Sequence, residues 1–219
     1  MLARFRRHVD RVLHAAAADG GRFRDAGLAL LWGGACYGLV MGSFGGLMPD
    51  RLLQLLYSSV KVPMLIVATT LLALPSFFVL NTIAGLRDDF VAAMRAIAIT
   101  QGVVGIVLAA LAPFTALWYL TSANYYEATT FNGAMFALAS LTAQRTLRKR
   151  YAPLIARNPR HRTLLSVWVI LYVFVGIQMG WTLRPFVGDP QTPPSFFRTE
   201  SWGNAYVIVA DIVWRVVAK

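Results

Sequence analysis

The stretch GGACYGLVMGSFGG, residues 33–46, places six glycines in fourteen positions in the middle of an apolar run. Glycine is the poorest helix former after proline. Four of the glycines follow one another at intervals of four residues: Gly34, Gly38, Gly42 and Gly46. On a helix this spacing forms one smooth face, and such GxxxG faces let membrane helices pack backbone against backbone. The stretch therefore predicts a membrane helix built for close contact with another helix.

The glycine face could pack against another helix of the same chain or against a second subunit, and the sequence leaves both alternatives open. Within the chain, a later apolar segment carries its own small residues, Gly133 with Ala137 and Ala139 with Ala143. Small residues on both sides allow two backbones to approach closely. This later segment is therefore the internal partner that the sequence favours.

The composition of the whole chain agrees with a membrane protein. Of its 219 residues, 57% are hydrophobic and only 14% are charged, and the mean hydropathy is +0.56. Soluble domains carry about 25% charged residues. The net charge of +11 would suggest nucleic acid in a soluble protein, but here it fits cytoplasmic loops that contact anionic lipid headgroups. We therefore expect membrane lipids, and no nucleic acid, as partners.

Hydropathy divides the chain into five expected membrane spans, at about 28–48, 62–83, 96–120, 130–146 and 164–183. Most are near the ~20 residues that cross a bilayer. The fourth is short and begins with the polar sequence ATTFNG, so it is the weakest of the five. Pro63 is expected to open the second span, where its missing N–H costs nothing. The prediction is an all-α polytopic bundle over residues 28–183.

Both ends of the chain predict helices that lie on the membrane surface. Residues 1–27 form a basic segment. Within it, residues 2–16 place apolar side chains on one helical face and basic side chains largely on the other, as in an interfacial amphipathic helix. Residues 184–219 begin with a proline-rich loop and end in NAYVIVADIVWRVVAK, a helix too short to span. We assign the first segment to the cytoplasm and the last to the outer side.

Loop charge sets this orientation. Fifteen of the 21 Lys and Arg residues fall in segments 1–27, 84–95 and 145–163, which lie on one side of the membrane if there are five spans. Basic residues are concentrated in cytoplasmic loops. The N-terminus is therefore expected inside and the C-terminus outside.

No catalytic, cofactor or metal site is expected from this sequence. No charged residue or histidine lies at the middle of an expected span, and the three histidines, His8, His14 and His161, fall in basic cytoplasmic segments. Intramembrane chemistry and ion transport usually require an ionisable residue at membrane depth. The chain is therefore expected not to be an enzyme.

The outer sequence RPFVGDPQTPPSFFRTESWG, residues 184–203, is the best candidate for contact with a partner. It combines prolines, which limit its freedom before binding, with aromatic and arginine side chains that suit protein contact. The candidate contact residues are Arg184, Phe186, Phe196, Phe197, Arg198 and Trp202. The alternative is that this loop folds back over its own helices.

Two segments together, LPSFFVLN at residues 74–81 and WTLRPFVGDPQTPPSFFR at residues 181–198, resemble a group of uncharacterised bacterial integral membrane proteins. The resemblance implies a bacterial inner membrane and carries no site residues. The function expected from the sequence is a non-enzymatic subunit or scaffold of a membrane complex, with other membrane subunits or a second copy as partners. The alternative is a small channel or transporter.

Overall fold

The computed structural model describes residues 23–46, 48–189 and 192–197, and all regular structure within them is helical. The expected all-α fold is confirmed to this extent. Two short 3-10 turns accompany five long helices. The elements are α2 (Phe23–Gly42), η1 (Pro49–Arg51), α3 (Leu52–Ile83), η2 (Arg87–Asp89), α4 (Phe90–Thr121), α5 (Tyr125–Arg157) and α6 (Arg160–Thr182).

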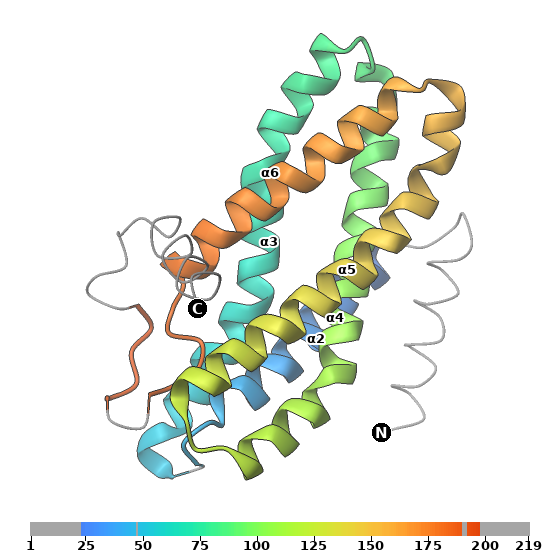
Figure 1. Cartoon of the computed structure of the whole chain (residues 1–219). Coiled ribbons are helices and arrows are strands. Elements are labelled where there is room, and N and C mark those ends of the chain that lie inside the picture. The colour runs from blue at the N-terminus through green and yellow to red at the C-terminus, as the bar shows by residue number, and fades with distance from the viewer. Residues whose placement is uncertain (1–22, 47, 190–191, 198–219) are drawn as a thin grey trace, which may run out of the picture.

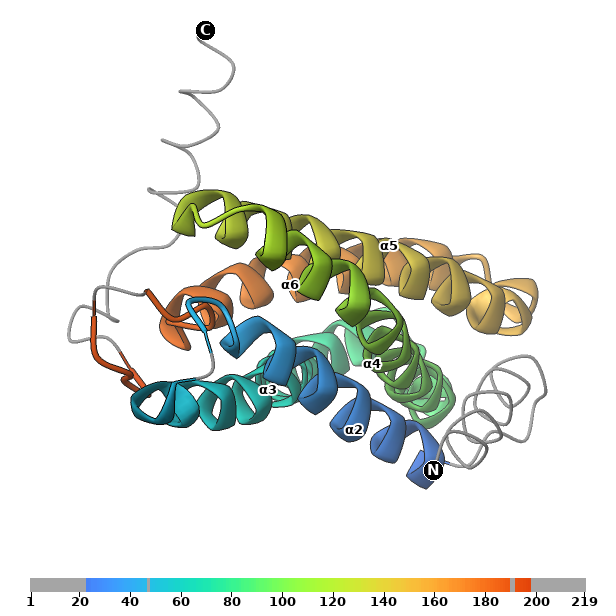
Figure 2. The ribbon, with the colours of Figure 1, turned by 90° about the horizontal axis from the view of Figure 1, so that it is seen from below.

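The five helices form a ring in which each packs against two neighbours. The order around the ring is α2, α4, α5, α6 and α3, and α3 returns to α2. In Figure 2 the pair α2 and α3 lies on one side of the bundle and the pair α5 and α6 on the other. Figure 1 shows α5 and α6 diverging from their shared end, and these two helices touch only sparsely. The ring is therefore least tightly closed between α5 and α6.

Helix ends follow local rules that the sequence carries. Gly45 and Gly46 adopt positive φ angles of 86° and 104° just after α2, and Gly85 does so with 72° just after α3. Glycine adopts this left-handed conformation without the steric cost that other residues meet. Asn124 caps α5, because its side-chain oxygen accepts from the amides of Tyr126 and Glu127.

Several polar side chains are buried in the bundle and many large apolar side chains face outward, as expected for helices in lipid. On α3, Gln54, Thr69 and Asn81 are buried, whereas Val60 and Leu71 are more than half exposed. Three helical segments are long and apolar enough to cross a membrane: Leu52–Ile83, Arg87–Thr121 and Arg160–Thr182. This supports a membrane protein.

A buried hydrogen-bond network joins three helices near the glycine-rich end of α2. The Tyr37 hydroxyl donates to the Asn132 side-chain oxygen at 2.8 Å, and the Asn132 amide donates to the Tyr119 hydroxyl at 2.6 Å. Thr115 donates to Tyr37 at 3.3 Å. Asn132 belongs to the polar sequence ATTFNG, which made the fourth span the least certain of the five. The polar side chain of Asn132 is used for hydrogen bonds inside the bundle.

The prediction that Pro63 opens a span was wrong. Helix α3 begins at Leu52 and passes through Pro63, which packs its ring against Gly34 of α2. The polar residues of 49–61 suggested a loop. Gln54, Ser58 and Lys61 are instead spaced by four and three residues, so they share one buried face of the helix.

The other boundaries also moved. Helix α5 runs well past both ends of the expected span 130–146, and α2 ends at Gly42 rather than at 48. The charged sequence after residue 145 suggested a loop because it is polar, but charged residues such as Arg and Lys are good helix formers. The expected surface helices at 2–16 and 204–219 lie outside the described residues.

Candidate binding cavity and the predicted contact residues

The glycine face of α2 packs against α3 within the same chain. A Cβ added at Gly38 would overlap the backbone of Ser58, and one added at Gly42 would lie 2.8 Å from the Gln54 carbonyl oxygen. At Gly34 it would lie 3.2 Å from the nitrogen of Pro63. These three glycines are therefore needed for an internal contact between two backbones.

Two details of the glycine prediction were wrong. Gly46 lies beyond the end of α2, and a Cβ there would meet nothing within 4 Å. The expected partner, the small face of α5, is also not the one used, because Gly133 and Ala137 instead line a cavity. The reason is that α3 starts ten residues earlier than expected, which extends it alongside the glycines.

A second close contact, between α2 and α4, escaped the sequence analysis. A Cβ at Gly33 would overlap the backbone of Gly105, and one at Gly105 would lie 2.6 Å from the Ala29 carbonyl oxygen. Gly102 faces Ala26 in the same way, at 2.8 Å. The signal was present as small residues at 26, 29, 33 and at 102, 105, spaced by three and four residues.

The segment after α6 folds back onto α3, where it is held by a buried lysine. The Lys61 ammonium donates to the carbonyl oxygens of Pro185 at 2.7 Å and Ser195 at 3.5 Å. Its Nζ atom also lies 4.8 Å from the ring centroid of Phe196 and 6.0 Å from that of Tyr57. Lys61 is fully buried by these contacts. We call this arrangement the lysine latch.

Side chains on the same face of α3, together with Arg51 of η1, extend the contact. Gln54 donates to the Phe186 carbonyl at 3.2 Å, and the Ser58 hydroxyl donates to the same oxygen. Arg51 donates to the Asp189 carbonyl at 2.9 Å. Backbone carbonyls in the described part of the loop thus accept hydrogen bonds from polar side chains of α3 and from Arg51. The loop therefore folds back onto its own helices, as in the alternative given in the sequence analysis.

The predicted contact residues therefore have different environments. Arg184 lies over the Trp181 ring, with 3.0 Å between the guanidinium carbon and the ring centroid, and Phe186 packs against the hydrophobic core. Phe196 is held at the lysine latch, whereas Phe197 is 52% exposed. Arg198 and Trp202 lie outside the described residues.

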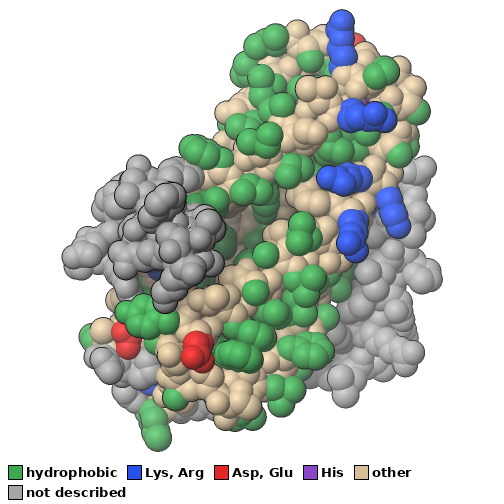
Figure 3. Space-filling model, viewed as in Figure 1, with side chains coloured by type: hydrophobic (Ala, Val, Ile, Leu, Met, Phe, Trp, Pro, Cys, Tyr) green, Lys and Arg blue, Asp and Glu red, His purple; other side chains and the backbone are tan. Residues whose placement is uncertain are grey.

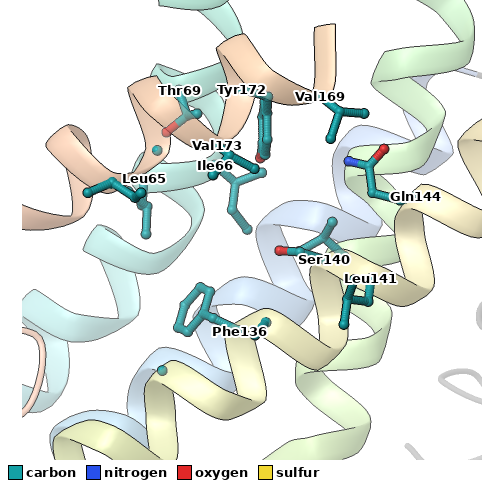
Figure 4. Close-up of a pocket in the computed structure, with 15 residues that line it drawn as sticks. Leu65, Ile66, Thr69, Phe136, Ser140, Leu141, Gln144, Val169, Tyr172 and Val173 are labelled. Atoms are coloured by element: carbon teal, nitrogen blue, oxygen red, sulfur yellow. The ribbon is translucent and has the colours of Figure 1, made fainter. Parts of the chain in front are cut away.

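A cavity of about 630 Å³ lies inside the ring, lined by residues of α3, α4, α5 and α6. Ile66, Phe136 and Val173 give it apolar walls, as Figure 4 shows. In the space-filling view a hollow is visible between α6 and α5 (Figure 3). The cavity thus lies where the ring is least tightly closed. Its volume falls within the range of about 300–1,000 Å³ that is typical of ligand sites.

A few polar groups interrupt the apolar walls. The buried oxygens Oγ1 of Thr69 and Oε1 of Gln144 have no hydrogen-bond partner within the described residues. The Tyr172 hydroxyl donates to Gln101 at 3.1 Å, so this polar group is satisfied. Apolar walls with a few polar groups are typical of sites that hold an apolar or amphipathic molecule.

A small charged cluster joins η2, which precedes α4, to the end of α5 and the start of α6. Asp89 lies 3.1 Å from Nε2 of His161 and 3.5 Å from Arg157. His161 is fully buried, while the Arg157 side chain is mostly exposed. No local pattern indicates this pairing, because Asp89 and His161 are 72 residues apart. The cluster thus joins the start of α4 to the end of α5 and the start of α6.

Within the described part of the chain, no group of three or more His, Cys, Asp or Glu residues is placed to hold a metal ion. No known protein family, curated protein or solved structure matches the chain.

Proposed function

We propose that the protein is a non-enzymatic subunit or scaffold of a bacterial inner-membrane complex, and that it binds an apolar, membrane-borne molecule in the cavity between α5 and α6. In this proposal all five helices cross the membrane, with the N-terminus in the cytoplasm. The outward-facing apolar side chains and the three long apolar helices support the membrane setting. The excess of basic residues in segments 1–27, 84–95 and 145–163 supports the orientation.

The cavity is the observation that carries this proposal. It is lined by four helices, and it lies where α5 and α6 diverge. A membrane-borne molecule reaches the apolar walls without crossing water, and filling the cavity adds van der Waals contacts that an empty cavity lacks. An opening between two membrane helices admits a ligand sideways from the bilayer.

The glycine face of α2 is not a recruiting surface in this proposal, because its contacts with α3 are internal. Contact with a partner protein is assigned instead to the exposed ring of Phe197 and its immediate surroundings. The lysine latch would hold this ring at a fixed place on α3, which lowers the entropy lost on binding.

Filling the cavity tests the proposal. A Cβ at Gly133 would meet nothing within 4 Å, so Gly133→Leu places a side chain at the cavity wall without overlapping the backbone of another helix. We expect the purified variant to retain less co-purified amphiphile, measured by solvent extraction and mass spectrometry, while it still folds. Gly180→Leu is the matched control, since Gly180 also has open space but does not line the cavity. Equal retention by the two variants would contradict the proposal.

A small channel or transporter is the second candidate, and the cavity among four helices favours it. Transport requires that the cavity also open to water or to the opposite leaflet, whereas binding requires only one entrance. Solute flux through liposomes that contain only the purified protein would replace the scaffold proposal with this one. We expect no such flux.

A further inference from the structure

The cavity ends on α5 where a run of basic residues begins. Its lining on α5 extends from Gly133 to Gln144, and Arg145, Arg148 and Lys149 follow directly. Arg148 lies on the same helix face as Gln144, about 6 Å further along the axis at 1.5 Å per residue. Figure 3 shows basic side chains gathered over the C-terminal half of α5 beside the hollow. We call Arg145, Arg148 and Lys149 the basic cluster.

The basic cluster is exposed and is not paired with a carboxylate of the described residues. All three side chains belong to exposed residues. Within the described residues the ion pairs are those of Asp89 with Arg157 and His161, so no described carboxylate neutralises the cluster. The cluster therefore attracts an anion, and the adjoining apolar cavity attracts a hydrocarbon chain.

The position of the cluster along α5 fits the depth of a lipid headgroup. The lining residues 133–144 fall inside the expected span 130–146, and the cluster begins at its end. Twelve helical residues cover about 18 Å, which is a little more than half of the ~30 Å hydrocarbon core. The cavity is thus as deep as one leaflet, and the cluster lies at its headgroup level.

We propose that the cavity binds an acyl chain of an anionic phospholipid from the cytoplasmic leaflet, and that the basic cluster holds its phosphate headgroup. This inference rests on the proposed function, since it names the class of molecule that the cavity binds. Gln144, whose side-chain oxygen has no partner in the described residues, lies at the junction between chain and headgroup, where lipid ester and hydroxyl groups are found. Charge selects the headgroup, and the apolar walls select the chain.

The test compares two lipids with identical acyl chains. The delipidated protein is titrated in neutral detergent with phosphatidylglycerol and with phosphatidylcholine, and binding is measured by native mass spectrometry. Each basic group near a headgroup contributes about a fivefold preference for the anionic lipid. We expect phosphatidylglycerol to bind about a hundredfold more tightly, and Arg145→Gln/Arg148→Gln, which leaves only Lys149, to reduce the preference to about fivefold.

The matched control is Arg87→Gln/Arg95→Gln, which removes the same charge from exposed positions on the same expected side of the membrane. It should keep the full preference. Equal binding of the two lipids by the unchanged protein, or equal loss of preference in both double variants, would overturn the headgroup assignment. Binding of soluble glycerol phosphate as tightly as phosphatidylglycerol would also overturn it, because the site would then recognise the anion alone.

Gly133→Leu separates this inference from the proposed function. If Gly133→Leu weakens the binding of both lipids equally and the unchanged protein shows no headgroup preference, the cavity binds an apolar chain and only the headgroup assignment fails. If it weakens neither lipid, the bound lipid lies elsewhere and both proposals fail. Weakened binding of both lipids with the preference intact is the expected result.

Discussion

At the scale of single residues, Lys61 is the position where sequence and structure differ most. The sequence assigns it to an outer loop, where a lysine is exposed and makes no specific contact. In the structure it is fully buried, because the loop after α6 closes over it. That closure joins residues 124 positions apart, and no local pattern predicts so distant a contact. The helical spacing of Gln54, Ser58 and Lys61 was the available signal.

Replacing Lys61 by Met should release the segment that the lysine latch holds. Methionine keeps an apolar stem of similar length, but the carbonyl of Pro185 loses its closer donor and keeps only the Gln54 amide at 3.5 Å. A buried carbonyl that is left poorly satisfied costs up to about 1–3 kcal/mol. We expect a lower midpoint of thermal unfolding and faster labelling of a cysteine placed at Ser195. Arg95→Met, at an exposed basic residue outside the basic cluster, is the control and should change neither. Unchanged labelling in Lys61→Met would show that Lys61 does not hold the segment.

At the scale of helices, the glycine pattern predicted a close contact but not the partner. Gly34, Gly38 and Gly42 have the spacing that packs backbones together, and they do so. The partner is α3 because this helix begins early enough to lie alongside the glycines. The start of α3 carries a buried polar face, and in the sequence that polar stretch resembles a loop. Periodicity predicts that a face is buried, whereas the neighbour that covers it is set by tertiary packing. The cavity was missed for the same reason, since it results from the divergence of two helices that the sequence treats separately.

Even a single methyl group should disturb the contact between α2 and α3. The Cβ of Gly38→Ala would overlap the Ser58 backbone, which cannot move aside as a flexible side chain can. Overpacking of this kind typically costs about 1–3 kcal/mol. We expect a reduced yield of folded protein and a lower unfolding midpoint in detergent. Gly27→Ala, where nothing lies within 4 Å of the added Cβ, is the matched control and should be stabilised slightly or unchanged.

At the scale of the whole molecule, charge is distributed unevenly along the bundle. Basic side chains gather at the C-terminal half of α5, and the acidic side chains visible in Figure 3 are mostly near its other end. If the bundle crosses the membrane as proposed, this asymmetry places the basic cluster in the cytoplasm. The lipid proposal depends on that orientation, because the cytoplasmic leaflet is the one whose anionic lipids face the cluster.

Cysteine labelling from outside the cell tests the orientation directly. The native Cys36 is first replaced by serine, and single cysteines are then placed at Ala152 and Thr192, both of which are exposed. A membrane-impermeant maleimide should label Thr192→Cys in intact spheroplasts and label Ala152→Cys only after the membrane is opened. The physical reason is that Ala152 follows the basic cluster on α5, whereas Thr192 lies in the loop after α6, across the membrane in the proposed topology. Labelling of Ala152→Cys from outside would show that the bundle has the opposite orientation, with the basic cluster facing the outer leaflet.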